Sequence, residues 1–245
     1  KLILQNAFRR ELDWDQELPE ELKNGVARWI ENLRALQHYR IPRPYHDKIM
    51  SPICHRQLHL FSDASEAAYG SMCFIRNEHE EGRISVSLVA TKSRLAPLRS
   101  KPTIPRMELS GCVLSSRLYS FVKRELNIPI EKVVFWTDSN AAISYIRNRS
   151  TRFSVYVGNR TSEIQATTNI EDWRFIGTEE NVADGLSRGI FPSTFDRHPY
   201  HHGPPFLYRP ESEWPTEKSP SALAPDPEEV RKELVMQSSA DSPPS

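Results

Sequence analysis

The chain has 245 residues, of which 32 are Lys or Arg, 32 are Asp or Glu, and 38% are apolar. This length allows one large domain, or one medium domain with flanking segments. No apolar run approaches the ~18–20 residues that cross a bilayer, which excludes an integral membrane protein. Cys54, Cys73 and Cys112 are odd in number and widely spaced, which argues against a disulfide framework and favours a reducing compartment. No secretory leader is visible at Lys1, and we expect a piece of a longer polypeptide.

The neutral total charge conceals basic stretches in the middle of the chain. Residues 83–124 contain nine Lys or Arg and a single acid, Glu108. Residues 139–162 contain four Arg and no acid, whereas residues 209–245 carry eight acids and four bases. Basic stretches of this kind are typical of nucleic-acid-binding surfaces, and they also occur as ordinary solvated surfaces.

The two ends of the chain differ in composition from its middle. Helical periodicity over residues 18–38 predicts a helix that ends before Ile41-Pro-Arg-Pro44, and we expect residues 1–56 to form a connection from a preceding domain. Eleven of the 19 prolines follow Gly189, among Ser, Asp and Glu. Residues 191–245 are therefore expected to be a largely disordered linker or tail, with one short helix over 227–237.

Residues 57–190 are expected to form the structured domain, in which strands come first and helices later. Three strands over 57–63, 68–76 and 84–95, joined by short links, predict an antiparallel meander. A long helix over 105–126 follows, and then a continuously apolar strand over 133–136 that helices cover on both faces. Further helices are expected at 139–146, 151–165 and 180–188, with a strand at 170–176. The order predicts an α/β fold with a mixed five-stranded sheet flanked by helices.

Four acids fall at the ends or beginnings of these elements. Asp63 ends the first strand, Asp138 directly follows the buried strand, and Asp184 lies in the last short helix. Glu108 lies in the first turn of the long helix, on a face that would lie close to a sheet because its other residues are small. These small neighbours are Gly111, Cys112 and Ser115.

Each acid taken alone has an ordinary explanation as a turn residue, a helix cap or a first-turn acid. As a set, they would meet at the carboxyl ends of two strands, where ligands bind in folds built on a sheet. Converging carboxylates repel one another, and hard divalent cations such as Mg²⁺ relieve that repulsion through oxygen ligands. Two such ions can bind the attacking and leaving oxygens of a phosphoryl displacement.

Four short motifs follow one another through this domain. They are Phe61-Ser-Asp-Ala-Ser-Glu-Ala-Ala-Tyr-Gly70, Pro105-Arg-Met-Glu-Leu109, Trp136-Thr-Asp-Ser-Asn140 and Asn181-Val-Ala-Asp-Gly-Leu-Ser-Arg-Gly189. In this order they resemble the ribonuclease H domain of retrotransposon polyproteins, above all the BEL/Pao class. The resemblance covers residues 57–189 and extends less distinctly to residues 2–43, which are similar to the connection between polymerase and nuclease.

The resemblance implies a metal-dependent endonuclease that hydrolyses the RNA strand of RNA–DNA hybrids during reverse transcription. It implies that the four acids are catalytic and hold two Mg²⁺ ions, with Mn²⁺ as a possible substitute: Asp63, Glu108, Asp138 and Asp184. Seven nearby residues are candidates for contacts with the hybrid: Ser65, Lys92, Arg94, Arg106, Ser139, Asn140 and Arg160. The expected partners are the hybrid and the polymerase and integrase modules of the same polyprotein, with no membrane. The expected location is intracellular, in cytoplasmic virus-like particles or in the nucleus.

Three other kinds of protein share some of these features. An aspartic peptidase is excluded because neither Asp63-Ala-Ser nor Asp138-Ser-Asn has the required Asp-Thr/Ser-Gly turn. An integrase core fits less well, because Glu108 precedes Asp138 and lies on a helix. The third alternative, a catalytically inactive module of domesticated or connection type that holds nucleic acid, stays open. The histidine that many ribonucleases H carry before the last helix is missing from residues 175–181, where Thr178 and Glu179 are the polar substitutes.

Overall fold

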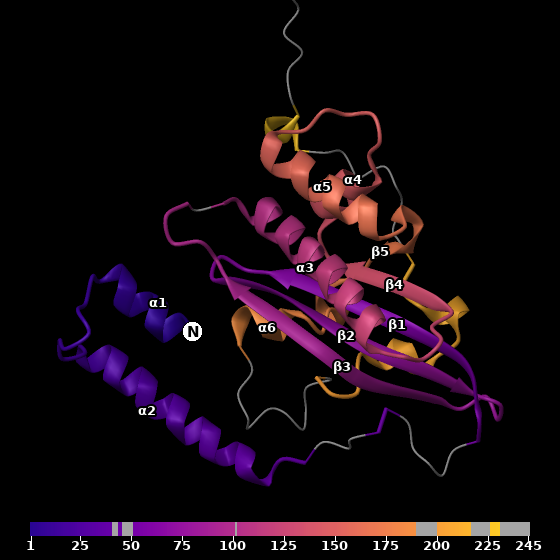
Figure 1. The fold of residues 1–245 in the computed structure, drawn as a ribbon, viewed down its shortest axis with the longest axis horizontal. Coiled ribbons are helices and arrows are strands. Elements are labelled where there is room, and N and C mark those ends of the chain that lie inside the picture. The colour runs from indigo at the N-terminus through magenta and orange to yellow at the C-terminus, as the bar shows by residue number, and fades with distance from the viewer. Residues whose placement is uncertain (41–43, 46–50, 101, 190–199, 217–225, 231–245) are drawn as a thin grey trace, which may run out of the picture.

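The computed structural model describes residues 1–40, 44–45, 51–100, 102–189, 200–216 and 226–230. Within these residues one five-stranded sheet in the order β3-β2-β1-β4-β5 forms the centre of the molecule (Figure 1). Its strands are β1 (Ile53–Ala64), β2 (Ala68–His79), β3 (Ile84–Leu95), β4 (Lys132–Thr137) and β5 (Trp173–Phe175). The first three strands pair antiparallel, and β4 pairs parallel with both β1 and β5. The predicted mixed α/β sheet is therefore confirmed.

The helices also follow the predicted order. They are α1 (Leu2–Arg9), α2 (Glu20–Ala35), α3 (Ile104–Glu125), α4 (Asn140–Arg147), α5 (Val155–Thr167) and α6 (Asp184–Arg188). Helix α1 was not predicted, and the helix expected over 180–188 is shorter because the Asn181 side chain accepts a hydrogen bond from the Ala183 amide (3.2 Å) and holds a turn there. No helix in the described part of the chain has the length and apolar character that crossing a membrane requires.

Alternating side chains of the strands build two cores, one on each face of the sheet. On one face, Leu58, Leu60 and Cys73 are buried under α3, α4 and α5. On the other face, Phe61 and Phe74 are buried under residues around α6 and under residues 200–216. Both faces of β4 are covered, as its continuous apolar run predicts.

Helix α3 lies very close to the sheet because the residues that face it are small. A Cβ atom at Gly111 would lie 3.2 Å from the backbone oxygen of Asp63. One turn further, the hydroxyls of Ser115 and Ser71 are 2.7 Å apart and hydrogen-bonded. The close approach confirms the prediction from the small residues, and it brings the N-terminal half of α3 to the ends of β1 and β4.

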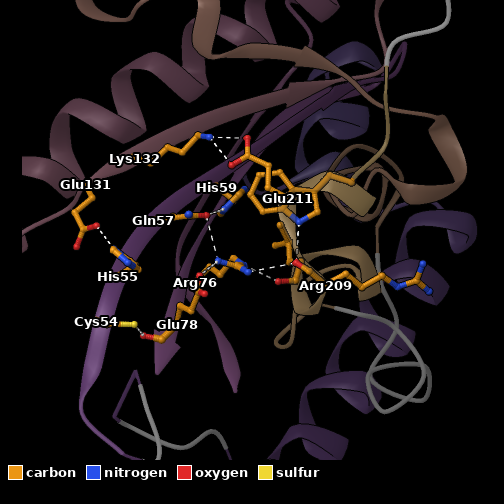
Figure 2. Close-up of polar contacts among 12 residues, drawn as sticks. Cys54, His55, Gln57, His59, Arg76, Glu78, Glu131, Lys132, Arg209 and Glu211 are labelled. Carbon is orange, nitrogen blue, oxygen red and sulfur yellow. Dashed lines mark hydrogen bonds and ion pairs between the residues drawn. The ribbon is translucent and has the colours of Figure 1, made fainter. Parts of the chain in front are cut away.

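Residues 200–216 are part of this fold, an ordered stretch within the C-terminal part that was expected to be largely disordered. Phe206, Leu207 and Trp214 are buried against the sheet. The buried guanidinium of Arg76 donates to the Leu207 carbonyl (2.8 Å), and Lys132 forms an ion pair with Glu211 at 2.6 Å (Figure 2). One adjacent apolar pair and a single tryptophan among prolines give no periodic signal, although they are enough to cover one end of the sheet. Of the helix expected over 227–237, residues 227–229 form a single 3-10 turn, and residues 231–237 lie outside the described part.

The segment 200–216 encloses His59 of β1. Nδ1 of His59 accepts a hydrogen bond from Nε1 of Trp136 (3.1 Å), and the ring lies edge-on to Trp214. Burial lowers the pKa of His59 well below its ordinary value, and the nearby cations Arg76 and Arg174 lower it further. His59 is therefore a neutral, buried part of the core.

Replacement of Trp214 by Ala is expected to lower the free energy of unfolding by about 3–5 kcal/mol, because it leaves a large cavity beneath a segment that covers the sheet. Urea denaturation followed by circular dichroism measures this change. The matched control is Trp14→Ala, since Trp14 is 95% exposed and its loss should change stability by less than about 0.5 kcal/mol. Equal effects of the two variants would contradict the docking of residues 200–216.

Candidate active site

Asp63 and Asp138 lie side by side because they follow paired positions on neighbouring parallel strands. Ser62 of β1 is paired with Thr137 of β4, and each acid is the next residue along its strand. Adjacent strands are ~4.8 Å apart, so the two acids lie close together at the same end of this strand pair. Strand β4 ends there because Ser139 caps α4, its hydroxyl accepting a hydrogen bond from the Ala142 amide (3.0 Å).

Glu108 reaches this edge from α3. Its side chain is half-buried and accepts a hydrogen bond from the hydroxyl of Ser139, the same hydroxyl that caps α4. A single serine therefore connects the start of α4, directly after Asp138, to the acid on α3. Ser139 was expected to contact the substrate, whereas in the structure it is buried and positions Glu108.

Asp184 arrives from the opposite face of the sheet, on α6. The turn before α6 is fastened to β1 by Asn181, whose side-chain nitrogen donates to the backbone oxygen of Ser62 (2.9 Å). Gly70 of β2 leaves room for the helix, since a Cβ atom there would lie 2.6 Å from Cβ of Leu186. Asp184 itself forms an ion pair with Arg188 one turn later, with Nε and Oδ1 2.7 Å apart.

Two contacts of α6 with the site were not predicted. The hydroxyl of Ser187 donates a hydrogen bond to Oδ2 of Asp63. The hydroxyl of Ser65, which was expected to contact the substrate, donates to the backbone oxygen of Ser187 (3.0 Å) and so ties the β1–β2 turn to α6. Ser187 is three residues after Asp184, on the same side of one helical turn, and this spacing is the signal that would have found it.

Burial and repulsion from neighbouring acids disfavour the charged forms of Asp63 and Glu108. Asp63 is only 8% exposed, and burial raises its pKa to about 6, with the charges of Asp138 and Asp184 adding to the rise and the Ser187 hydroxyl opposing it. Burial also raises the pKa of Glu108, again with contributions from Asp138 and Asp63, and the Ser139 hydroxyl opposes the shift. The four acids thus form one electrostatically coupled set, because Asp63 interacts through its charge with each of the other three.

The donor set fits a hard divalent cation, although the side chains are not gathered around one point. All four acids offer oxygen ligands, and a cation would offset the burial and the repulsion that raise the pKa of Asp63. In the described part of the chain, no three His, Cys, Asp or Glu side chains lie close enough together to coordinate a single ion. Instead Asp63, Glu108 and Asp184 are each turned towards a protein partner, namely Ser187, Ser139 and Arg188.

Of the basic candidates, two are held by the protein itself. Arg106 forms a two-pronged ion pair with Glu229, with Nε and Oε1 2.5 Å apart. Arg160 lies over the ring of Tyr156, 3.4 Å from its centre, and donates to the hydroxyl of Ser110 (3.3 Å). Their guanidinium groups therefore stabilise the packing of α5 on α3.

The other candidates are open to solvent. Lys92 and Arg94 are exposed and two residues apart on edge strand β3, so they share one side of it. Asn140 is exposed in the first turn of α4, two residues after Asp138. Arg94, Arg117 and Arg160 line a pocket of about 230 Å³ between β3, α3 and α5, which makes this side of the molecule basic.

The sheet order, with acids at the ends of β1 and β4 and a third acid on α3, defines an RNase H-like domain. The family model described as "Pao retrotransposon-like RNaseH-like domain" matches residues 1–139, more than half of the chain. The chain belongs to this family. The match runs through the predicted boundary at residue 56 and includes Asp63, Glu108 and Asp138, and it ends before Asp184.

The chain is also similar to solved RNase H structures at low sequence identity. The N-terminal RNase H domain of Rv2228c from Mycobacterium tuberculosis is 12% identical, with 54% of this chain and 91% of that chain covered and a TM-score of 0.36. RNase H1 from Halobacterium salinarum is 9% identical (55% and 96% covered, TM-score 0.34). LC11-RNase H1 in complex with an RNA/DNA hybrid is 11% identical (57% and 98% covered, TM-score 0.37). No curated protein matches the sequence.

Replacement of Asp63 by Asn is expected to stabilise the metal-free protein by up to about 3 kcal/mol at about pH 7.5, and by much less at about pH 4. The folded protein binds the Asp63 proton more tightly than the unfolded chain, because the folded pKa is about 6 and the ordinary value is 3.8. The bound proton therefore stabilises the folded protein fully below about pH 4, and this contribution is lost as the pH rises through 6. Asn does not ionise, so the variant does not lose stability in this way.

Urea denaturation in the presence of a chelator, at several pH values, measures this difference. The matched control is Asp13→Asn, which removes an exposed carboxylate and should give no comparable pH dependence. A destabilisation by Asp63→Asn that grows with pH would show that Asp63 is not a repelled, buried carboxylate.

Proposed function

We propose that this chain is a metal-dependent ribonuclease H that hydrolyses the RNA strand of RNA–DNA hybrids during reverse transcription of a Pao-type retrotransposon. The observation that carries the proposal is the placement of Asp63 and Asp138 on adjacent strand ends, with Glu108 and Asp184 in electrostatic reach. Membership of the Pao RNaseH-like family supports it. The proposed partners are the hybrid and the polymerase and integrase modules of the same polyprotein.

The four acids would hold two Mg²⁺ ions, or Mn²⁺ in their place. When bound, such ions activate water as the attacking group and neutralise charge on the leaving oxygen. The chain's own residues prepare the site in two ways. The hydroxyls of Ser187 and Ser139 hold Asp63 and Glu108 in place, and burial of the carboxylates lowers the effective dielectric around the reacting groups.

The basic side of the molecule would bind the phosphates of the hybrid. Lys92 and Arg94 are exposed on β3, and Arg94 is shared with the basic pocket next to α3. Phosphate contacts of this kind position a nucleic acid without reading its sequence. Asn140 is exposed two residues after Asp138, and its amide would bond to a 2′-hydroxyl of the RNA strand.

A second candidate function is that of an inactive module that holds nucleic acid without cutting it. The observation in its favour is that no three acidic or other ligand side chains converge on one point in the described residues. Both functions require binding of a hybrid, so hydrolysis is the property that separates them.

Cleavage of a labelled RNA–DNA hybrid in Mg²⁺ or Mn²⁺ is expected for the unchanged chain, with single-stranded RNA left intact. Asp138→Asn should reduce cleavage by about a thousandfold or more, because charge stabilisation by a bound cation is worth several kcal/mol. Asp172→Asn, a surface carboxylate near β5, is the matched control and should cut normally. Hybrid binding without any cutting would favour the inactive module.

The double variant Lys92→Gln/Arg94→Gln should bind the hybrid more weakly and with a shallower salt dependence. Each lost phosphate contact lowers the slope of log K against log salt concentration by about 0.9 for a duplex of the B-DNA type. Fluorescence anisotropy in a chelator, at several salt concentrations, measures the slope. Arg10→Gln, directly after α1 and paired with Glu21, is the control; an equal change in slope there would contradict the assignment.

A further inference from the structure

A short C-terminal segment, residues 226–230, is clamped between α3 and α5 (the small yellow segment beside α5 in Figure 1). Val230 forms an antiparallel bridge with Phe153, and the Ser154 amide donates to the backbone oxygen of Glu229 (2.7 Å). The segment comes from the acidic C-terminal part of the chain, whereas its contacts are with residues near the ends of two domain helices.

The side chain of Glu229 is enclosed by donors that suit any oxyanion. Nε and Nη2 of Arg106 lie 2.5 and 3.1 Å from its two oxygens, and the hydroxyl of Ser154 lies 2.5 Å from Oε2. Its side chain is 5% exposed, and the ion pair with Arg106 holds its pKa below the ordinary value. A guanidinium in two-pronged geometry, with a hydroxyl at the N-terminus of a helix, binds phosphate as readily as carboxylate.

This anion site lies at the start of the helix that carries Glu108. Arg106 lies in the first turn of α3, two residues before Glu108, and Ser154 is the N-cap of α5. The Arg106 side chain lies against the ring of Tyr156 and is 33% exposed, so one side of it is open to solvent while Glu229 covers the other. The phosphates of a bound hybrid would approach Arg106 from this open side.

A second ion pair of α3 makes a useful contrast. Arg117 of α3 is paired with Glu163 of α5 in the same two-pronged geometry, at 2.5 and 2.9 Å. Both residues of this pair belong to α-helices, and the Glu163 side chain is 36% exposed. The Glu229 carboxylate differs because it is almost fully buried and because it belongs to a segment outside the sheet and the α-helices.

We propose that residues 226–230 are an autoinhibitory clamp, in which Glu229 occupies a phosphate-binding site made by Arg106 and Ser154. The hybrid backbone and Glu229 compete for this site, so the chain binds its substrate most tightly when the clamp is displaced. The inference rests on the proposed function, in that it takes the nucleic-acid backbone as the competing ligand.

The test measures hybrid binding by fluorescence anisotropy in a chelator, so that no cutting occurs. Glu229→Gln should raise the affinity for an RNA–DNA hybrid about tenfold and make the salt slope steeper by about one, because one more phosphate contact becomes available. Glu21→Gln makes the same change in charge in the exposed ion pair with Arg10, and it should alter the affinity less than about twofold. In an Arg106→Gln background, the gain from Glu229→Gln should disappear.

A different result is expected if residues 226–230 only stabilise the fold and do not compete with the hybrid. Glu229→Gln would then lower the melting temperature while leaving hybrid affinity and salt slope unchanged, and this outcome overturns the proposal. So does a gain that persists in the Arg106→Gln background.

Hydrogen exchange on the unchanged chain gives an independent test, whether or not the variants fold. The Glu229 amide donates to the Asp226 carbonyl (3.0 Å) in the clamp, and saturating hybrid should speed its exchange. The Thr168 amide, bonded to Ile164 at the far end of α5 (2.9 Å), should be unaffected. Unchanged or slower exchange at Glu229 contradicts displacement. Cleavage assays with Mg²⁺ on the same samples separate the two ideas, since loss of cutting alone refutes the nuclease and leaves the clamp standing.

Discussion

The parallel pairing of β1 with β4 is the constraint on which the rest of the site depends. It places Asp63 and Asp138 at the same edge of the sheet, one residue beyond the paired Ser62 and Thr137. Every other part of the site is fixed relative to this pair. Helix α3 approaches β1 through Gly111, α4 starts at the Ser139 cap, and α6 is fastened to the end of β1 by Asn181.

This arrangement concentrates an electrostatic penalty at one place. Burial and like charges raise the pKa of Asp63 to about 6, so the carboxylate is destabilised near neutral pH. The protein offsets part of the penalty through hydroxyl donors, and a hydrogen bond to a charged group is worth about 1.5–3 kcal/mol. Ser187 and Ser139 have this role, and Arg188 pairs with Asp184. Repulsion of this kind at a strand edge is typical of a site that binds cations, and it is the physical basis of the proposed ribonuclease H activity.

Much of the fold was predictable, because the elements that form the sheet are locally consistent. Alternation along residues 84–95 and the continuous apolar run before Asp138 give β3 and β4 directly, and the small residues after Glu108 predict the close approach of α3. Contacts between distant residues were not predictable. Arg106 and Glu229 are 123 positions apart, and only the fold brings them together, so a residue expected to bind phosphate was found to be paired. The burial of Trp214 was hidden in the same way, since one aromatic among prolines has no periodicity.

The central claim is that Asp63 is a buried carboxylate whose repulsion a divalent cation relieves. The most direct measurement is calorimetric titration with Mn²⁺ at about pH 6, in two buffers of different ionisation enthalpy, which reveals proton release on binding. Because Asp63 is about half protonated at that pH, the unchanged chain should release about half a proton per site, and Asp63→Asn should release much less. Binding of Mn²⁺ without proton release, equal release by the variant, or no binding at all would contradict the account.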